Sequence, residues 1–159
     1  MWIYKGEEFT SEMIEEWIGF VYLITDKSNG MKYVGKKLLT RVAKLPPLKG
    51  KTRRRHVVKE TDWKKYYGSS EAVKLMIEEK GVDNFHREIL YLCTSKGQLG
   101  YLEAKYQFVN DVLLRDDYYN GIIQCKIHRN HAKSLIGLNM DWIELNENKG
   151  WQPSDLVLY

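Results

Sequence analysis

The segment Phe20-Val-Tyr-Leu-Ile-Thr25, followed by Asp26-Lys-Ser-Asn-Gly30 and Met31-Lys-Tyr-Val-Gly35, predicts a β-hairpin. The first six residues are rich in β-branched and aromatic side chains and are apolar on both faces, which is typical of a central strand covered on both sides. Asn29-Gly30 favours a tight turn because these residue types accept positive φ angles. The third part then returns antiparallel to the first. This hairpin is the centre of the predicted fold.

The flanking segments predict three helices and one more strand. Helices are expected over residues 10–18, 71–80 and 95–113 from caps and helical spacing of apolar residues, and a strand is expected over residues 85–92. The resulting order is helix, two strands, loop, helix, strand, helix and tail. We therefore predict an α+β fold with a small three-stranded antiparallel sheet flanked by helices.

Length and composition exclude several classes of protein. The chain has 159 residues, which suggests one domain, and its 43% hydrophobic and 29% charged residues are ordinary for a globular protein. No apolar run approaches the roughly 20 residues that span a bilayer. Two cysteines, Cys93 and Cys125, cannot form a disulfide framework and favour a reducing compartment. The N-terminus lacks the pattern of a signal peptide.

Positive charge is concentrated in one part of the chain. The segment from Lys36 to Lys65 holds twelve basic and two acidic residues, a net charge of +10, whereas the remainder holds 13 basic and 19 acidic residues, a net charge of −6. We predict that this segment contacts the phosphates of nucleic acid; a solvated basic loop is the alternative. Pro46, Pro47 and Gly50 interrupt residues 38–62, which we therefore expect to be a long loop. The expected contacts are Lys49, Lys51, Arg53, Arg54, Arg55, Lys64 and Lys65.

Two tyrosines and one glutamate form a candidate catalytic set. Tyr22 and Tyr33 lie on the two strands of the hairpin, but buried aromatic pairs are common in cores, so the pair alone is weak support. Glu103 falls on or beside the apolar face of its predicted helix. Its helical neighbours, Leu99, Gly100, Tyr106 and Gln107, include no cation that would pair with it. A carboxylate turned toward a sheet needs a partner, and Mg²⁺ is one candidate.

These residues resemble the signature of the GIY-YIG endonucleases. Phe20-Val-Tyr22 and Tyr33-Val-Gly35 correspond to the two halves of that signature, with Phe-Val-Tyr in place of Gly-Ile-Tyr. The likeness covers residues 18–121 and is greatest to small phage-encoded, homing-like members with a basic insertion. It continues through Lys65-Tyr-Tyr-Gly-Ser-Ser70, Asn84-Phe-His-Arg-Glu-Ile-Leu90, Glu103 and Tyr118-Tyr-Asn120-Gly121.

The resemblance implies a DNA endonuclease that hydrolyses phosphodiester bonds with a single Mg²⁺ or Mn²⁺ ion. In this family Tyr22 or Tyr33 would help to deprotonate the attacking water, and Glu103 would hold the metal. Asn120 would support the site. Gly35 would allow the backbone to approach closely.

Two further roles in the family have no clear match. For the cation that stabilises the transition state we favour Lys37, because strand alternation puts it on the face of Tyr33 and Gly35; Arg41 is the second choice and a solvated lysine the plain alternative. For the additional His or Tyr of the family we choose Tyr67, with a packed core tyrosine as the alternative.

The resemblance also suggests an organisation and several competing functions. We predict an N-terminal helical extension (1–18), a nuclease domain (19–124) with a basic insertion (36–65), and a C-terminal extension (125–159). DNA is the expected partner, no membrane is expected, and a homo-oligomer stays open. The expected location is the cytoplasm, that of the host cell if the chain is phage-encoded.

Three roles for a nuclease stay open: homing, cutting of competing or host DNA, and restriction. The alternatives to a nuclease are a non-catalytic nucleic-acid-binding protein on the same fold and a protein that docks to a partner through residues 142–159.

Overall fold

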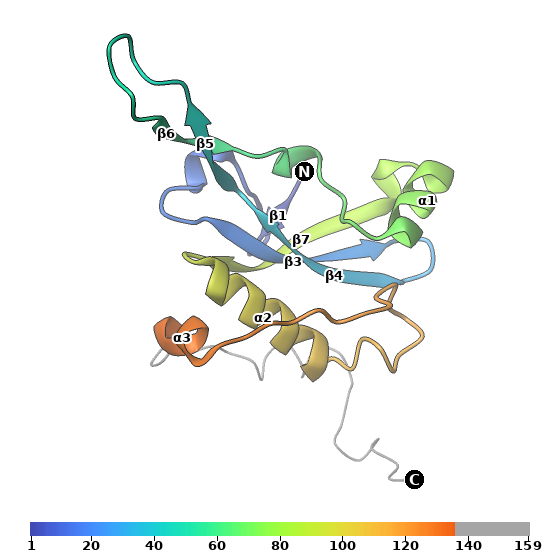
Figure 1. The fold of residues 1–159 in the computed structure, drawn as a ribbon. Coiled ribbons are helices and arrows are strands. Elements are labelled where there is room, and N and C mark those ends of the chain that lie inside the picture. Colours follow the sequence, from blue (N-terminus) through green and yellow to red (C-terminus); the bar gives the residue numbers. More distant parts are fainter. Residues whose placement is uncertain (136–159) are drawn as a thin grey trace.

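The predicted hairpin lies at the centre of a mixed sheet. In the computed structural model, which describes residues 1–135, β3 (Gly19–Asp26) pairs antiparallel with β4 (Lys32–Leu38), so that Tyr22 lies opposite Gly35. On its other side β3 pairs antiparallel with β7 (Phe85–Cys93). The hairpin and the strand expected over residues 85–92 are therefore confirmed (Figure 1).

The sheet is larger than the sequence indicates. It has five strands in the order β2-β1-β7-β3-β4, and β1 (Ile3–Tyr4) runs parallel to β7, so the expected three-stranded antiparallel sheet was wrong. Strand β2 (Glu7–Glu8) forms one edge of the sheet, next to β1, and β4 forms the other. Strands of two residues are too short to show an alternating pattern in the sequence.

The helix expected over residues 10–18 is absent. Only a short 3₁₀ turn, η1 (Ser11–Met13), forms there, and Glu15 has a φ of 40°, which a right-handed helix does not accept. The apolar residues of this stretch serve tertiary packing instead. Ile14 is buried together with Trp2, whose indole nitrogen donates to the carbonyl of Trp63 at 2.8 Å.

The other two helices are confirmed. Helix α1 (Glu71–Lys80) ends at Gly81, whose φ of 80° stops the helix. Helix α2 (Lys96–Val109) begins after Ser95, whose hydroxyl accepts from the amide of Gln98, and ends before the predicted residue 113. The remaining helical elements are short: η2 (Trp63–Lys65), η3 (Val82–Asn84), α3 (Arg129–Ala132) and η4 (Lys133–Leu135).

Strand β3 divides the core into two halves. Phe20, Tyr22 and Ile24 point into an aromatic cluster that also holds Trp2 and Trp63. The intervening Val21 and Leu23 point the other way, into a cluster with Val34, Leu99, Leu102 and Tyr106. Helix α2 packs on this second face of the sheet (Figure 1). All but one residue of β3 is buried, as expected for a central strand.

Asp26 anchors the end of β3 through a buried network. Its carboxylate accepts from Lys80 Nζ and Asn84 Nδ2, each at 2.6 Å, and from the amide and hydroxyl of Ser28. Burial alone would raise the pKa of Asp26, but the hydrogen bonds from Lys80, Ser28 and Asn84 outweigh it and hold the pKa well below its usual range. The network thus ties the hairpin to the end of α1.

We expect Asp26→Asn to lower the free energy of unfolding by about 2 kcal/mol, because the hydrogen bonds from Lys80 and Asn84 lose a charged acceptor. The folded-state pKa of Asp26 lies below that of the unfolded chain, so its contribution is complete above pH ~4 and is lost as the pH falls. Urea denaturation of both proteins at pH 7 and pH 3 measures this. A difference that does not shrink at pH 3 would contradict it.

Residues 40–60 form a second, separate sheet. β5 (Thr40–Leu45) pairs with β6 (Arg55–Glu60) over six residue pairs, and this ribbon projects from the main sheet (Figure 1). The expectation of a long loop over residues 38–62 was therefore wrong. The strands lack an alternating pattern because neither face of the ribbon is buried in the core.

The sequence predicts a C-terminal extension and no membrane span. Residues 136–159, with most of the predicted C-terminal extension and the docking segment 142–159, lie outside the described residues. Within residues 1–135, no helix combines the length and apolarity that a membrane span requires.

Candidate active site

A cleft of about 420 Å³ opens at the outer edge of β4. Side chains from both faces of the sheet reach it, because β4 is an edge strand and Gly35 presents no side chain there. Four of the predicted site residues line this cleft, and Lys36 and Ser69 join them. The predicted four are Tyr22, Tyr33, Glu103 and Asn120.

The two tyrosines lie side by side at the inner end of the cleft. Their ring centroids are 6.2 Å apart, and Tyr66 contacts Tyr22 from another side at 6.0 Å. Tyr22 is 1% exposed and its ring lies over Gly35, so that a Cβ at Gly35 would overlap the Tyr22 hydroxyl. The Tyr33 hydroxyl lies 3.4 Å from Ser69 Oγ. Gly35 therefore gives the Tyr22 hydroxyl its place in the cleft.

Both phenols are protonated at neutral pH. Burial raises the pKa of Tyr22 well above its usual range, and electrostatic interactions with the neighbouring Tyr66 and Tyr33 add to the effect. Burial also raises the pKa of Tyr33. The nearby Glu103 carboxylate raises both pKa values further. Each hydroxyl is therefore a neutral hydrogen-bonding group at the cleft.

Glu103 reaches the cleft from α2 and meets Lys36 from β4. The Lys36 Nζ lies 2.6 Å from Glu103 Oε2, and the Glu103 side chain is only 13% exposed. Burial raises the pKa of Glu103 and Lys36 partly offsets this. A cationic partner for Glu103 thus exists, but it comes from the sheet and not from the helix.

The carboxylate of Glu103 fits a divalent cation held by few protein ligands. Among residues 1–135 no group of three or more His, Cys, Asp or Glu side chains is placed to hold a metal. Mg²⁺ keeps several waters and is commonly bound by one or two carboxylates together with substrate phosphates. Glu103, facing an open cleft beside neutral hydroxyls, satisfies that arrangement.

Asn120 joins the segment after α2 to the open edge of β4. Its Oδ1 accepts from the amide of Val34 at 2.9 Å, and its Nδ2 donates to the carbonyl of Val34 at 2.8 Å. Lys32 makes two similar backbone hydrogen bonds with Asp117 and Tyr119. The amide of Asn120 thus pairs with β4 as a neighbouring strand would, and it fixes the backbone between Tyr33 and Gly35.

A family model described as "Putative endonuclease segE, GIY-YIG domain" matches residues 2–123. The chain belongs to the GIY-YIG endonuclease family. The match includes the whole main sheet, the ribbon, both long helices and all the cleft residues except Gln124. Searches of curated proteins and of solved structures found no match.

Three predicted residues of the GIY-YIG domain do not line the cleft. Lys37 pairs with Asp62 at 2.6 Å and lies 4.0 Å from the Tyr66 ring centroid. Arg41 lies exposed on β5. The Tyr67 ring stacks on the guanidinium of Arg87 at 4.0 Å. Lys36 does line the cleft, and Tyr66 contacts Tyr22 at a ring-centroid distance of 6.0 Å.

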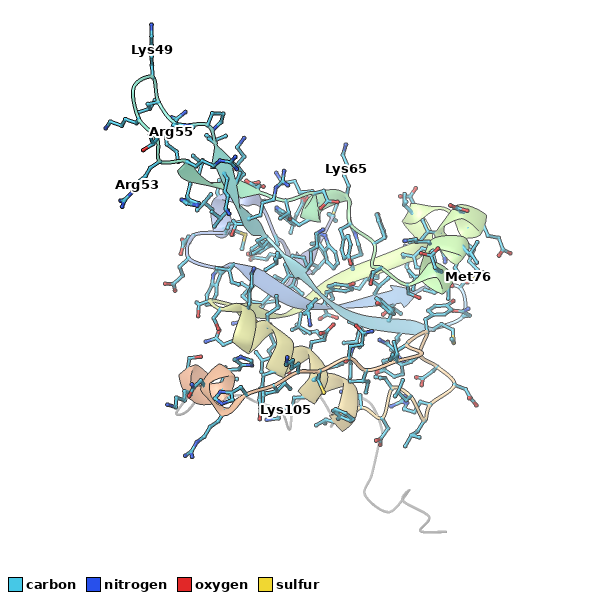
Figure 2. All side chains as sticks on the ribbon, viewed as in Figure 1. Lys49, Arg53, Arg55, Lys65, Met76 and Lys105 are labelled. Carbon is cyan, nitrogen blue, oxygen red and sulfur yellow. The ribbon has the colours of Figure 1, made fainter. Side chains whose placement is uncertain are left out.

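The predicted DNA-contacting residues of the GIY-YIG domain occupy two places. Lys49, Arg53 and Arg55 lie at the outer end of the ribbon, and Lys65 lies apart from them on η2 (Figure 2). Lys51 and Arg54 belong to the same outer loop, and Lys64 lies next to Lys65. None of these seven side chains takes part in an ion pair among residues 1–135.

We expect Asn120→Asp to lower both stability and the rate of DNA cleavage by the GIY-YIG domain. A carboxylate can still accept from the Val34 amide, but it cannot donate to the Val34 carbonyl, which costs about 2 kcal/mol. Thermal denaturation and plasmid cleavage measure the two effects. Asn29→Asp is the matched control, because Asn29 Oδ1 also accepts from a backbone amide, that of Met31, whereas its Nδ2 donates only one long, exposed hydrogen bond of 3.4 Å to the Tyr119 hydroxyl. Equal melting temperatures of the two variants would contradict this role.

Proposed function

We propose that this chain is a divalent-metal-dependent DNA endonuclease that hydrolyses phosphodiester bonds. Membership of the GIY-YIG family supports nuclease activity. The observation that carries the finer proposal is the meeting of one desolvated carboxylate, Glu103, with the hydroxyls of Tyr22 and Tyr33 in a single open cleft. The proposed metal is Mg²⁺ or Mn²⁺, held by Glu103.

The residues of the cleft divide the reaction between them. A divalent cation at Glu103 would supply positive charge to the scissile phosphate. The neutral hydroxyl of Tyr22 or Tyr33 would orient the attacking water by a hydrogen bond, and the water would lose its proton to solvent as the P–O bond forms. The leaving oxygen then departs from phosphorus as the ester bond breaks. Lys36, once separated from Glu103, would lie beside the developing negative charge.

Incubation of the protein with supercoiled plasmid tests this function directly. We expect nicked or linear DNA in the presence of Mg²⁺ or Mn²⁺ and intact plasmid in EDTA. Salt-sensitive binding without cleavage of duplex or branched DNA in either metal would overturn the proposal in favour of a non-catalytic nucleic-acid-binding protein. Mapping the ends of the products separates a homing-type enzyme, which cuts at one long site, from a degradative or restriction-type enzyme.

The source and the location of the protein are proposals of the same kind. A phage-encoded nuclease acting in the cytoplasm of its host would meet DNA in a reducing environment. The two cysteines of the described residues are free, which is in keeping with such an environment.

We expect Lys36→Met to move the acidic limb of the pH–rate profile to higher pH. Lys36 lowers the pKa of Glu103, so its loss lets burial raise that pKa further and lets protons compete with the metal at higher pH. Cleavage rates between pH 5 and pH 9 at fixed Mg²⁺ concentration measure the shift.

Lys37→Met is the matched control for this experiment, because it removes the adjacent lysine, which pairs with Asp62 outside the cleft. If the pH–rate profile shifts for Lys37→Met and not for Lys36→Met, Lys37 and not Lys36 is the cation that acts in cleavage.

A further inference from the structure

We propose that the β5–β6 ribbon (residues 40–60) enters the major groove of duplex DNA and holds the cleft against the adjoining backbone. This inference rests on the proposed function only in taking duplex DNA as the substrate. Its support comes from the exposure, the charge, the dimensions and the position of the ribbon.

Neither face of the ribbon is covered by a packed element of the described chain, although Val42 and Val58 line a hollow beside Trp17 and Glu60 accepts from Ser11 and Trp63 at the base. Every residue of β6 is exposed, and the facing pair Val42 and Val58 is 64% and 66% exposed. Its base is held by backbone hydrogen bonds of Leu39 with Ile18 and with Thr61, each 2.9 Å long. A two-stranded hairpin without a covered apolar face is marginally stable in water. The ribbon is therefore suited to being completed by a ligand.

The charge of the ribbon identifies that ligand as a polyanion. Residues 40–60 carry eight basic residues against one acidic residue, Glu60. Arg41 lies directly opposite Lys59, although like charges in facing positions destabilise a sheet. No ion pair among residues 1–135 neutralises any of the eight. A row of phosphates on each side of the ribbon would remove this repulsion.

The dimensions of the ribbon select the major groove of B-form DNA. Two strands lie about 4.8 Å apart, and six paired residues extend about 20 Å. The major groove, about 12 Å wide and 8.5 Å deep, admits a two-stranded ribbon, whereas the minor groove is only about 6 Å wide. The major groove of duplex RNA is too deep and narrow for side chains to read. B-form DNA is therefore the duplex that fits.

The two faces of the ribbon suit different parts of the groove. Pairing places Val42, Val58, Lys44 and His56 on one face and Arg41 and Lys59 on the other. Exposed valines are suited to contact with thymine methyl groups, which only the major groove presents. The arginine and lysine side chains are long enough to reach the phosphates along the groove walls.

The position of the ribbon connects the groove to the cleft. Strand β4 passes Gly35 and Lys36 at the cleft and continues through Leu39 into β5. A second hollow between cleft and ribbon is lined by Lys36, Lys37 and Arg41 together with the acidic Glu60 and Asp62. Asp62 pairs with Lys37, so Arg41 is the cation of this hollow that no ion pair of the described residues neutralises. DNA held by the ribbon would thus be placed with a phosphate beside Glu103.

Dimethyl sulfate footprinting of the full chain on duplex DNA in EDTA tests the groove. The reagent methylates guanine N7 in the major groove and adenine N3 in the minor groove. We expect protection of guanine N7 by the wild-type protein. We expect this protection to be lost in a variant with Gln at four positions of the ribbon loop (Lys49, Lys51, Arg53 and Arg54). Protection of adenine N3 alone, or equal binding of duplex RNA, would overturn the proposal.

The matched control places Gln at four exposed lysines outside the ribbon: Lys27, Lys96, Lys126 and Lys133. Each phosphate contact contributes about 0.9 to the slope of log K against log salt concentration, so the ribbon variant should lose about 3 to 4 from that slope. The control, with the same change in net charge, should keep both the slope and the footprint. Equal losses in the two variants would overturn the proposal by showing a general effect of charge.

The footprint does not depend on cleavage. Protection of guanine N7 by a chain that never cuts plasmid would sustain the ribbon assignment and overturn the nuclease proposal. Cleavage of plasmid without protection of guanine N7 would support the nuclease proposal and overturn the assignment of the ribbon to the major groove.

Discussion

Glu103→Gln should reduce the rate of plasmid cleavage about 1,000-fold while leaving DNA binding intact, because the carboxylate supplies several kcal/mol through the metal that it holds. Gln keeps the size of the side chain but cannot bind a divalent cation as strongly. It also frees Lys36 from its ion pair. Binding in EDTA should therefore be unchanged or tighter, since one negative charge is lost from the cleft. Single-turnover cleavage and a filter-binding assay measure the two quantities.

Glu71→Gln is the matched control for this substitution. Glu71 also pairs with a lysine, Lys74, at 2.7 Å, but its side chain is 82% exposed and lies on α1 outside the cleft. Its loss should leave cleavage within about twofold of the wild type, as is usual for an exposed ion pair. Similar cleavage rates for Glu103→Gln and the wild type would contradict the assignment of the metal to Glu103, whatever the outcome for DNA binding.

Gly35→Ala should reduce cleavage about 100-fold, because displacement of a catalytic group by about 1 Å has an effect of this size. The added methyl group would overlap the Tyr22 hydroxyl and lie 2.6 Å from the ring carbon that bears it. Tyr22 is held by Trp2 and Phe20 in the aromatic cluster, so relief requires movement of its ring or of β4. Overpacking of this kind also lowers stability by about 1–3 kcal/mol.

Gly121→Ala separates displacement of Tyr22 from a general effect on the cleft. Gly121 lines the same cleft, but a Cβ there would meet no atom within 4 Å. We expect near wild-type cleavage and stability for this control. Wild-type cleavage by folded Gly35→Ala would show that the position of the Tyr22 hydroxyl is not critical.

The sequence predicted the elements that carry a clear period. The continuous apolar run around Tyr22 and the helical spacing along α1 and α2 each survive in the structure because those segments bury one or two faces. The ribbon carried no such signal, since both of its faces are open. Residues 10–18 have a helical pattern, yet packing of Ile14 and Trp2 in the aromatic cluster prevailed over it.

A geometric reason explains why the sequence predicted only part of the cleft. Strand alternation correctly puts Tyr33, Gly35 and Lys37 on one face, and this reasoning favoured Lys37 as the cation. The cleft, however, lies at an edge where both faces meet, so Lys36 from the opposite face reaches Glu103.

The sequence could not decide which of two adjacent tyrosines would face Tyr22, because both lie in a short irregular segment. Tyr66 and Tyr67 are identical in type, and the 3₁₀ turn before them with Gly68 at a φ of 97° decides which one faces Tyr22.

The position of Asn120 has a consequence for self-association. An uncovered edge strand is a template for pairing with another chain, and native proteins protect such edges against aggregation. Strand β4 has an outer edge of this kind, and its backbone groups at Lys32 and Val34 are occupied by Asp117, Tyr119 and Asn120. The Asn120 side chain that steadies the backbone of β4 thus also shields it from strand addition, so we expect its loss to favour oligomers and fibrils joined through β4.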